Sequence, residues 1–257
     1  MDSNVVRVDL NQVDAVSETL PTIAFLLLAV AALCNDLVLS FIHERVPQQP
    51  ALPDILFAVM PYLPWGLSIS EYLMLSSVAM MFIIAFFHRY RWIVLRRIAF
   101  LGSLLYFGRC VTMIVTQVPV ADVNYPCAPR LGANHTVWDI IWRGLRVAGS
   151  LGLNINGKII LCGDYIYSGH TVVVALLHFL SILVSLSGAI FLILSRGHYT
   201  VDVVLSYWIT TRAFWIYHTL VSYSALKACW YRVFRFMEGN IHKPVPRKYV
   251  DHTPFIC

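Results

Sequence analysis

Two histidines and one aspartate stand out in the sequence because of the chemistry they could do together. His198 and Asp202 are four residues apart at the start of an apolar stretch. His170 follows a Ser-Gly pair and lies just before a different apolar stretch. On a helix, a spacing of four puts both side chains on one face, within reach of a carboxylate–imidazole hydrogen bond. Such a carboxylate makes the other ring nitrogen a better nucleophile or base. His170 could then give a proton to a leaving oxygen.

This combination predicts transfer of a phosphoryl group through a covalent phospho-histidine, without a metal. No cluster of cysteines and histidines has the spacing of metal ligands, so neither a metal nor another cofactor is expected. A single HxxxD pair is a weak signal by itself. However, an aspartate inside a membrane span is costly, and it therefore indicates a function.

The composition predicts the class of protein that must hold these residues. Of the 257 residues, 58% are hydrophobic and only 13% are charged, whereas soluble domains carry roughly 45–50% apolar and about 25% charged residues. Disorder is excluded for the same reason. The net charge of +5 comes from basic residues beside apolar runs, which is typical of membrane proteins and does not indicate nucleic-acid binding. The sequence predicts an all-α, polytopic transmembrane bundle.

The apolar stretches are long enough to cross a bilayer as helices, and they lack the alternation of a β-barrel. We expect a cytoplasmic N-terminal segment over residues 1–20, a transmembrane catalytic domain over 21–220 and a basic cytoplasmic tail over 221–257. No cleaved signal peptide is expected, so the first stretch is interpreted as a retained anchor. The predicted apolar spans are Pro21–Ile42, Ser70–Phe87, Ile98–Val118, Thr171–Leu194 and Val201–Tyr217.

Basic residues predict the orientation of these spans. Four arginines in the short segment His88–Arg97, and the basic tail, place both of these regions in the cytoplasm. The loops at 43–69 and 119–169 then face the lumen or the exterior. The second loop contains a glycosylation sequon at Asn134 and two cysteines, Cys127 and Cys162, which an oxidising compartment allows to form a disulfide.

The other four cysteines have different expected roles. Cys34 and Cys110 lie inside spans and are interpreted as apolar filler. Cys229 and Cys257 lie in the tail and are candidates for reversible palmitoylation.

Four blocks of residues, in order along the chain, resemble the sphingomyelin synthase family of the lipid phosphate phosphatase superfamily. The resemblance covers most of the chain from His43 onward. The blocks are His43-Glu44-Arg45-Val46-Pro47 with Leu52-Pro53-Asp54; Arg96-Arg97 with Tyr106, Arg109 and Thr116; Cys162-Gly163-Asp164 with Ser168-Gly169-His170-Thr171; and His198-Tyr199-Thr200-Val201-Asp202-Val203 with Tyr207, Thr210-Thr211-Arg212 and Trp215.

The resemblance implies a transferase that moves a phosphocholine or phosphoethanolamine headgroup from a glycerophospholipid to ceramide. His198 would attack the donor phosphorus, oriented by Asp202, and diacylglycerol would leave with a proton from His170. The ceramide hydroxyl would then attack the phospho-histidine, with His170 as base, which predicts ping-pong kinetics. The family plan implies six helices and a lumenal or extracellular site in the Golgi or plasma membrane, and it allows a homodimer.

Further residues are candidates for binding the substrates. Arg109 lies inside the third span, where an unpaired guanidinium is expensive, so either a phosphate or a buried carboxylate such as Asp164 must pair with it. Arg212 is expected to extend toward the membrane surface instead. Tyr165, Tyr167 and Tyr199 are placed to form an aromatic cage for a choline group. The predicted substrate-binding residues are Arg109, Tyr106, Asp164, Ser168 and Tyr199.

The sequence departs from the family pattern between the two histidine blocks. Only 27 residues separate His170 from His198, enough for a helix of about 40 Å and thus one crossing of a core about 30 Å thick. Both histidines on one face would need two crossings. The chain therefore lacks a segment, or has its fourth and fifth spans shortened or merged, or crosses once and has no intact site. Arg196-Gly197 also replaces a His and an acidic residue.

These observations leave three functions open. The leading one is the headgroup transferase. The second is a lipid phosphatase or phospholipase-C-like hydrolase, in which water replaces ceramide. The third is an inactive family member that acts as a membrane interaction protein. The sequence does not decide between choline and ethanolamine or between acyl chains.

Overall fold

The computed structural model describes residues 19–88, 90–122, 127–132, 135–149, 161–164, 182–222 and 232–238. Within these residues every regular element is a helix, as the composition predicts. The elements are α2 (Thr19–His43), α3 (Ile55–Val59), α4 (Gly66–Phe87), α5 (Arg91–Val115), α6 (Val137–Gly149), α8 (Ile182–Leu194), α9 (Thr200–Ser222) and α11 (Arg232–Glu238).

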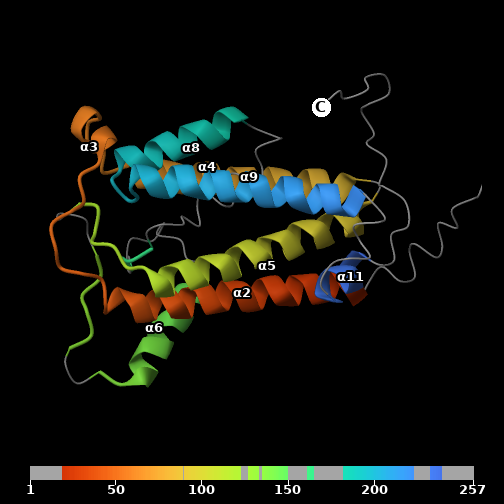
Figure 1. The fold of residues 1–257 in the computed structure, drawn as a ribbon, viewed down its shortest axis with the longest axis horizontal. Helices are drawn as coiled ribbons and strands as arrows, with labels where there is room; N and C mark the ends of the chain where they lie inside the picture. Colours follow the sequence, from red (N-terminus) through yellow and green to blue (C-terminus); the bar gives the residue numbers. More distant parts are fainter. Residues whose placement is uncertain are drawn as a thin grey trace, which may run out of the picture.

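The long helices run side by side as a bundle (Figure 1). Among the described residues, α2, α4 and α5 are long and apolar enough to cross a membrane, which confirms the predicted class. These helices are apolar on nearly all sides because lipid, rather than water, surrounds them. α2 packs mainly on α5, and α4 packs mainly on α8.

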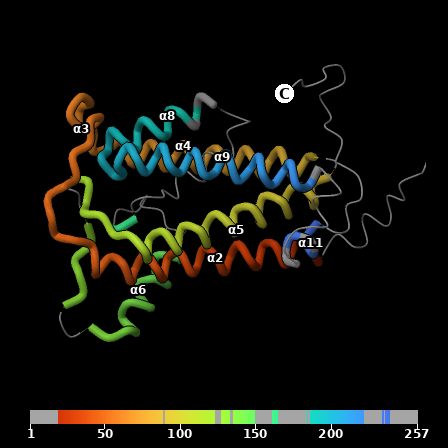
Figure 2. Tube along the Cα trace, viewed as in Figure 1, coloured from red at the N-terminus to blue at the C-terminus, as the bar shows by residue number. Residues whose placement is uncertain are grey.

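The bundle has two distinct ends, which Figure 2 shows as a trace. We call one of them the loop end, where α2 and α5 finish and α4 and α9 begin; it carries α3, α6 and the segments around residues 44–65 and 116–132. We call the other the tail end, where α4 finishes and α2 and α5 begin; it carries α11. The described parts of the loops predicted to face the lumen or exterior therefore share one end, and the described residues of the basic 88–97 segment lie at the other.

The boundaries of the third span differ from the predicted Ile98–Val118. The helix begins earlier, at Arg91, and ends at Val115. Arginine is a good helix former, so the arginine-rich segment extends the helix beyond the apolar run. The helix stops before Thr116, which is extended. Pro119 disfavours a helical conformation at Val118, the predicted last residue of the span.

A buried carboxylate joins the elements at the tail end. Glu238 of α11 is 1% exposed. Its carboxylate accepts hydrogen bonds from Arg96 Nη2 at 3.2 Å, from Arg97 Nη2 at 2.9 Å and from the Tyr217 hydroxyl at 2.8 Å. Phe234, from the same short helix, is buried against Phe100 of α5. The end of the described chain is therefore held by both charge and apolar packing.

The predicted apolar stretch Thr171–Leu194 is described only over α8. The described part of this helix has 13 residues and spans about 20 Å. It ends at the loop end, where the Leu63 N–H donates to the Leu194 carbonyl at 2.9 Å. Residues 171–181 lie outside the described residues.

Candidate functional site

The His198–Asp202 pair lies at the loop end, where the chain turns from α8 into α9. The imidazole Nδ1 lies 3.7 Å from Asp202 Oδ2, an ion-pair distance that is longer than a hydrogen bond. Both residues are buried, at 5% and 1% exposure. His198 itself is not helical, contrary to the expectation that both residues share a helical face, because α9 begins only at Thr200. The turn still brings the two side chains together.

Asp202 is held by the start of its own helix. Its Oδ2 accepts the Tyr199 backbone N–H at 2.9 Å, so the carboxylate caps the first turn, where peptide N–H groups lack partners. The same oxygen faces His198. The carboxylate is therefore fixed in place before any substrate binds, which is what orienting an imidazole requires.

Tyr199 connects three segments of the loop end. Its hydroxyl accepts a hydrogen bond from the Leu52 N–H at 3.0 Å and donates to the Pro119 carbonyl at 3.1 Å. Its ring stacks on Phe57, with 5.8 Å between the centroids. The residue is only 3% exposed, so its observed role is to hold loops together. A contact of Tyr199 with a lipid headgroup stays a prediction.

Asp54 is a residue of this site for which the sequence indicated no role, although it belongs to a quoted block. Its carboxylate accepts hydrogen bonds from the Thr200 N–H and from the Thr200 hydroxyl, both at 2.7 Å, and from the Leu56 N–H at 3.0 Å. Burial alone would raise the pKa of Asp54, but these hydrogen bonds lower it below its usual value. Asp54 thus caps α3 and also secures the start of α9.

Arg109 pairs with a protein carboxylate, which was one of the two partners predicted for it. Its Nη2 forms an ion pair with Asp164, and its Nη1 donates to Asn35 Oδ1 at 2.8 Å. The arginine is 4% exposed. Tyr106, half-buried, lies one turn earlier on α5. The polar residues of α2 and α5 therefore meet inside the bundle, beside the Cys162-Gly163-Asp164 segment.

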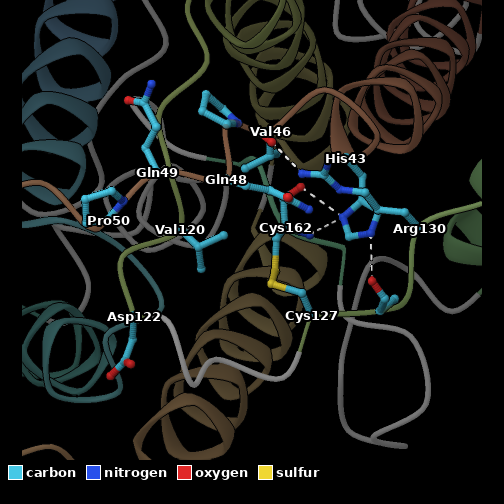
Figure 3. A pocket seen from close by; sticks show the side chains of 12 residues that line it. His43, Val46, Gln48, Gln49, Pro50, Val120, Asp122, Cys127, Arg130 and Cys162 are labelled. Atoms are coloured by element: carbon cyan, nitrogen blue, oxygen red, sulfur yellow. Dashed lines mark hydrogen bonds between the residues drawn. A yellow bond between two sulfur atoms is a disulfide. The ribbon is translucent and has the colours of Figure 1, made fainter.

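His43, at the end of α2, holds this segment in place (Figure 3). The Cys162 N–H donates to His43 Nδ1 at 2.8 Å, and Nε2 lies 3.0 Å from the Ala128 carbonyl, to which it donates. The ring is 3% exposed. Gly163 follows with φ of 120°, and a side chain there would lie 2.7 Å from Val46, so the motif needs a glycine at this point.

Cys127 and Cys162 form a disulfide, as their shared loop allows, and Cys34 and Cys110 are free. The disulfide lines a cavity of about 670 Å³ at the loop end. In Figure 3 the cavity residues come from the end of α2, from the loop that follows it and from the segment after α5. The lining residues include His43, Gln48, Gln49, Val120, Asp122 and Arg130.

The structure brings the Cys162-Gly163-Asp164 part of one predicted block and the turn at His198 to one end of the bundle. Asp164 contacts Arg109, near the end of α5, and the turn at His198 contacts the residues that follow α5. The three predicted arrangements between His170 and His198 depend on residues 165–181, which lie outside the described residues. His170, Ser168, Tyr165 and Tyr167 lie outside the described residues, and so do Asn134, Cys229 and Cys257.

Comparisons with known proteins place the sequence of this chain in a family. Residues 161–219 match the model of the PAP2 superfamily C-terminal region, which includes His170, His198 and Asp202. The chain is 47% identical over 253 residues to phosphatidylcholine:ceramide cholinephosphotransferase 1 of Caenorhabditis elegans, covering 88% of this chain and 54% of the relative. It is 35% identical over 262 residues to the Homo sapiens protein of the same name, covering 91% of this chain and 62% of the relative.

A third relative is covered more completely. Phosphatidylcholine:ceramide cholinephosphotransferase 2 of Rattus norvegicus is 35% identical over 252 residues, covering 87% of this chain and 68% of the relative. The chain thus spans a little over half to about two thirds of the length of these relatives.

Proposed function

The chain belongs to the phosphatidylcholine:ceramide cholinephosphotransferase family, the sphingomyelin synthases, and we propose that it transfers phosphocholine from phosphatidylcholine to ceramide. The products are sphingomyelin and diacylglycerol. The observation that carries this proposal is the buried His198–Asp202 pair, with a carboxylate fixed 3.7 Å from the imidazole. The names of the relatives supply the two lipid substrates.

In the first half-reaction, His198 attacks the phosphorus of the donor lipid. A nitrogen–phosphorus bond forms while the bond from phosphorus to the diacylglycerol oxygen breaks, and His170 gives that oxygen a proton. Asp202, held at the helix start, stabilises the imidazole as it becomes positive. Its carboxylate needs no rearrangement to do so, because the Tyr199 N–H already orients it.

In the second half-reaction, the primary hydroxyl of ceramide attacks the phospho-histidine. His170 removes the hydroxyl proton, the oxygen–phosphorus bond forms and the nitrogen–phosphorus bond breaks. The burial of His198, at 5% exposure, favours this lipid acceptor over bulk water, because a shielded phospho-histidine is protected from hydrolysis. The transferase is therefore preferred to the lipid hydrolase.

The site faces the lumen or the exterior in this proposal, in the Golgi or plasma membrane. Two features, one at each end of the bundle, support that orientation. The loop end holds a disulfide, and disulfides persist in oxidising compartments. The opposite end carries the arginines of α5 and the tail helix α11, as the positive-inside rule expects for a cytoplasmic face.

The proposal is tested by expressing the chain in cells that lack sphingomyelin synthase, feeding fluorescent ceramide and separating the lipids by thin-layer chromatography. We expect a new phospholipid band that disappears in His198→Ala. His218→Ala is the matched control, because His218 lies in α9, the helix that follows His198, and packs on Phe214 with 4.0 Å between the ring centroids. That variant should keep the band.

The outcomes separate the alternatives. The mobility of the band distinguishes phosphocholine from phosphoethanolamine. Release of diacylglycerol without ceramide would favour the hydrolase. No product from correctly localised protein would contradict the enzyme proposal and favour a non-catalytic membrane protein. A homodimer, which the family resemblance allows, is tested separately by chemical cross-linking.

A further inference from the structure

Arg196 has an unusual backbone conformation two residues before His198. Its φ is 49°, and it is the one residue other than glycine with a positive φ in the described part of the chain. Side chains with a Cβ seldom adopt this left-handed conformation. A glycine would fit with less strain, and glycine is in fact the next residue, Gly197. The position therefore holds an arginine despite the cost to the backbone, which indicates that the side chain has a role.

The side chain of Arg196 contacts two other segments of the loop end. Nη1 lies 3.2 Å from Asp122 Oδ2, after α5, and Nη2 lies 3.4 Å from the Phe57 carbonyl in α3. The guanidinium carbon also lies 5.4 Å from the centre of the Tyr62 ring and 5.8 Å from that of Phe57. Both distances are within the range of a cation–aromatic interaction.

These contacts continue to His198 through its neighbour Tyr199. Phe57 lies against Arg196 on one side and stacks on the Tyr199 ring at 5.8 Å. The Tyr199 hydroxyl in turn donates to the Pro119 carbonyl, three residues before Asp122. Arg196 precedes His198 and Tyr199 follows it, and both residues thus contact the same two segments, α3 and the segment after α5. The turn cannot shift without breaking contacts on both sides.

We propose that Arg196 is a positioning residue, which together with Asp122 locks the turn so that the His198 imidazole stays directed toward Asp202. The catalytic consequence rests on the proposed function, whereas the fixed position of His198 does not. A direct phosphate contact by Arg196 is the competing role. The Asp122 carboxylate already neutralises the guanidinium, which favours the lock over the phosphate contact. The side chain of Asp122 is 10% exposed and that of Arg196 is 31% exposed.

The first test compares Arg196→Ala, Arg196→Gly and Arg196→Lys in the lipid-transfer assay. We expect Arg196→Ala to lower kcat by up to about 100-fold, the size of effect of a misplaced reacting group, with little change in KM for the donor lipid. Arg196→Gly relieves the backbone strain but removes the same contacts, so it should be equally impaired. Full activity of Arg196→Gly would overturn the proposal. Arg196→Lys keeps the charge and should recover part of the loss.

The second test exchanges the charges. The double variant Arg196→Asp with Asp122→Arg can rebuild the ion pair, so its kcat should exceed that of either single variant. A raised KM without rescue by the exchange would instead show that Arg196 binds the donor phosphate. Arg45→Ala is the control, because Arg45 is exposed at the same end and also lies over an aromatic ring, Phe41, at 4.3 Å.

The third test does not depend on catalysis. Diethyl pyrocarbonate modifies accessible histidines, and peptide mass spectrometry gives the rate at His198 alone. His198 should react slowly in the wild type and several-fold faster in Arg196→Ala, with no change in Arg45→Ala. An equal rate in all three would overturn the lock. If the wild type makes no lipid product, the proposed function fails, but this measurement still decides whether Arg196 positions His198.

Discussion

Asp54 accepts hydrogen bonds from both the backbone N–H and the hydroxyl of Thr200, 146 residues away in the sequence. The carboxylate of Asp54, in the loop after α2, thus accepts hydrogen bonds both from its own loop and from the start of α9. That helix also carries Asp202, and the turn before it carries His198. The loop after α2 is therefore a part of the site rather than a connection between spans.

Replacing Asp54 by asparagine should weaken this attachment. An amide offers one acceptor oxygen where the carboxylate offers two, and it lacks the charge that favours a helix N-terminus. We expect a loss of about 1 kcal/mol in stability and a clear fall in transfer activity, measured by thermal unfolding in detergent and by the ceramide assay.

Asp139→Asn is the matched control for that experiment. Asp139 makes the same two kinds of hydrogen bond, to the Thr136 N–H and hydroxyl at 2.8 Å, but at the exposed start of α6. It should leave the activity unchanged. Equal activity in both variants would show that the Asp54–Thr200 connection has no bearing on the site.

Acidic pH should loosen the loop end in a defined range. The pKa of Asp54 is lower in the folded protein than its usual value of 3.8. The pKa of Glu44 is likewise lowered from 4.5, since hydrogen bonds from Arg143 and from the Leu131 N–H outweigh its burial. A carboxyl group whose pKa is lower in the folded protein than in the unfolded chain stabilises the fold at pH values above its unfolded pKa. That stabilisation is lost as the pH falls through the pKa of the folded protein.

The unfolding temperature should therefore fall as the pH drops below about 4.5 and continue to fall below about 3.8. Asp54→Asn lacks one of the two contributions, so its curve should approach that of the wild type at the acidic limit. A constant gap between the two curves at every pH would rule out the titration of Asp54 as the cause.

Removing the disulfide should disturb the segment that carries Asp164. Cys127→Ser breaks the covalent link to Cys162, and a lost native disulfide of this kind costs roughly 2–4 kcal/mol. We expect faster proteolysis of the loop and weaker transfer activity. Cys34→Ser, at a free cysteine inside the bundle, is the control and should keep the wild-type mobility on non-reducing gels. Unchanged activity in Cys127→Ser would mean that the His43 hydrogen bond and the Arg109–Asp164 ion pair hold the segment without the disulfide.

Arg109 should tolerate substitution poorly, even by lysine. Its guanidinium serves Asn35 and Asp164 at once, whereas a lysine ammonium is a point charge without that planar geometry. Arg109→Ala leaves the Asp164 carboxylate without this partner, which costs about 3–5 kcal/mol for a buried pair. Thermal unfolding and expression level measure the loss.

Arg212→Ala is the control. Arg212 lies at an exposed position of α9 over Trp208, so this variant should be nearly neutral. Comparable losses in the two variants would contradict the role given to the ion pair.

The spans were predictable because the length of an apolar run is a local property. α2, α4 and α5 follow from their hydrophobic residues alone. Their ends were less predictable, since the arginines before Ile98 continue the helix and Pro119 shortens it. The prediction of a missing, shortened or merged segment before α8 concerns residues outside the described part of the chain, so it stays a prediction.

In the site, the spacing of four predicted that His198 and Asp202 would meet, but not that His198 would lie in a turn. The ion pair of Arg109 with Asp164 was one of two open alternatives. The contacts of Asp54 with Thr200 and of Asp122 with Arg196 could not be predicted, because they join distant segments that only the folded bundle brings together. No periodicity or motif of one segment contains that information.

Glu238 has a consequence for the order in which the protein is made. Its partner Arg96 lies 142 residues earlier. The ribosome therefore releases α5 long before it releases the Glu238 carboxylate that neutralises Arg96. Until then, two arginines and the Tyr217 hydroxyl at the tail end must remain hydrated or borrow partners from lipid headgroups. The bundle therefore closes at this end last, after synthesis of its spans.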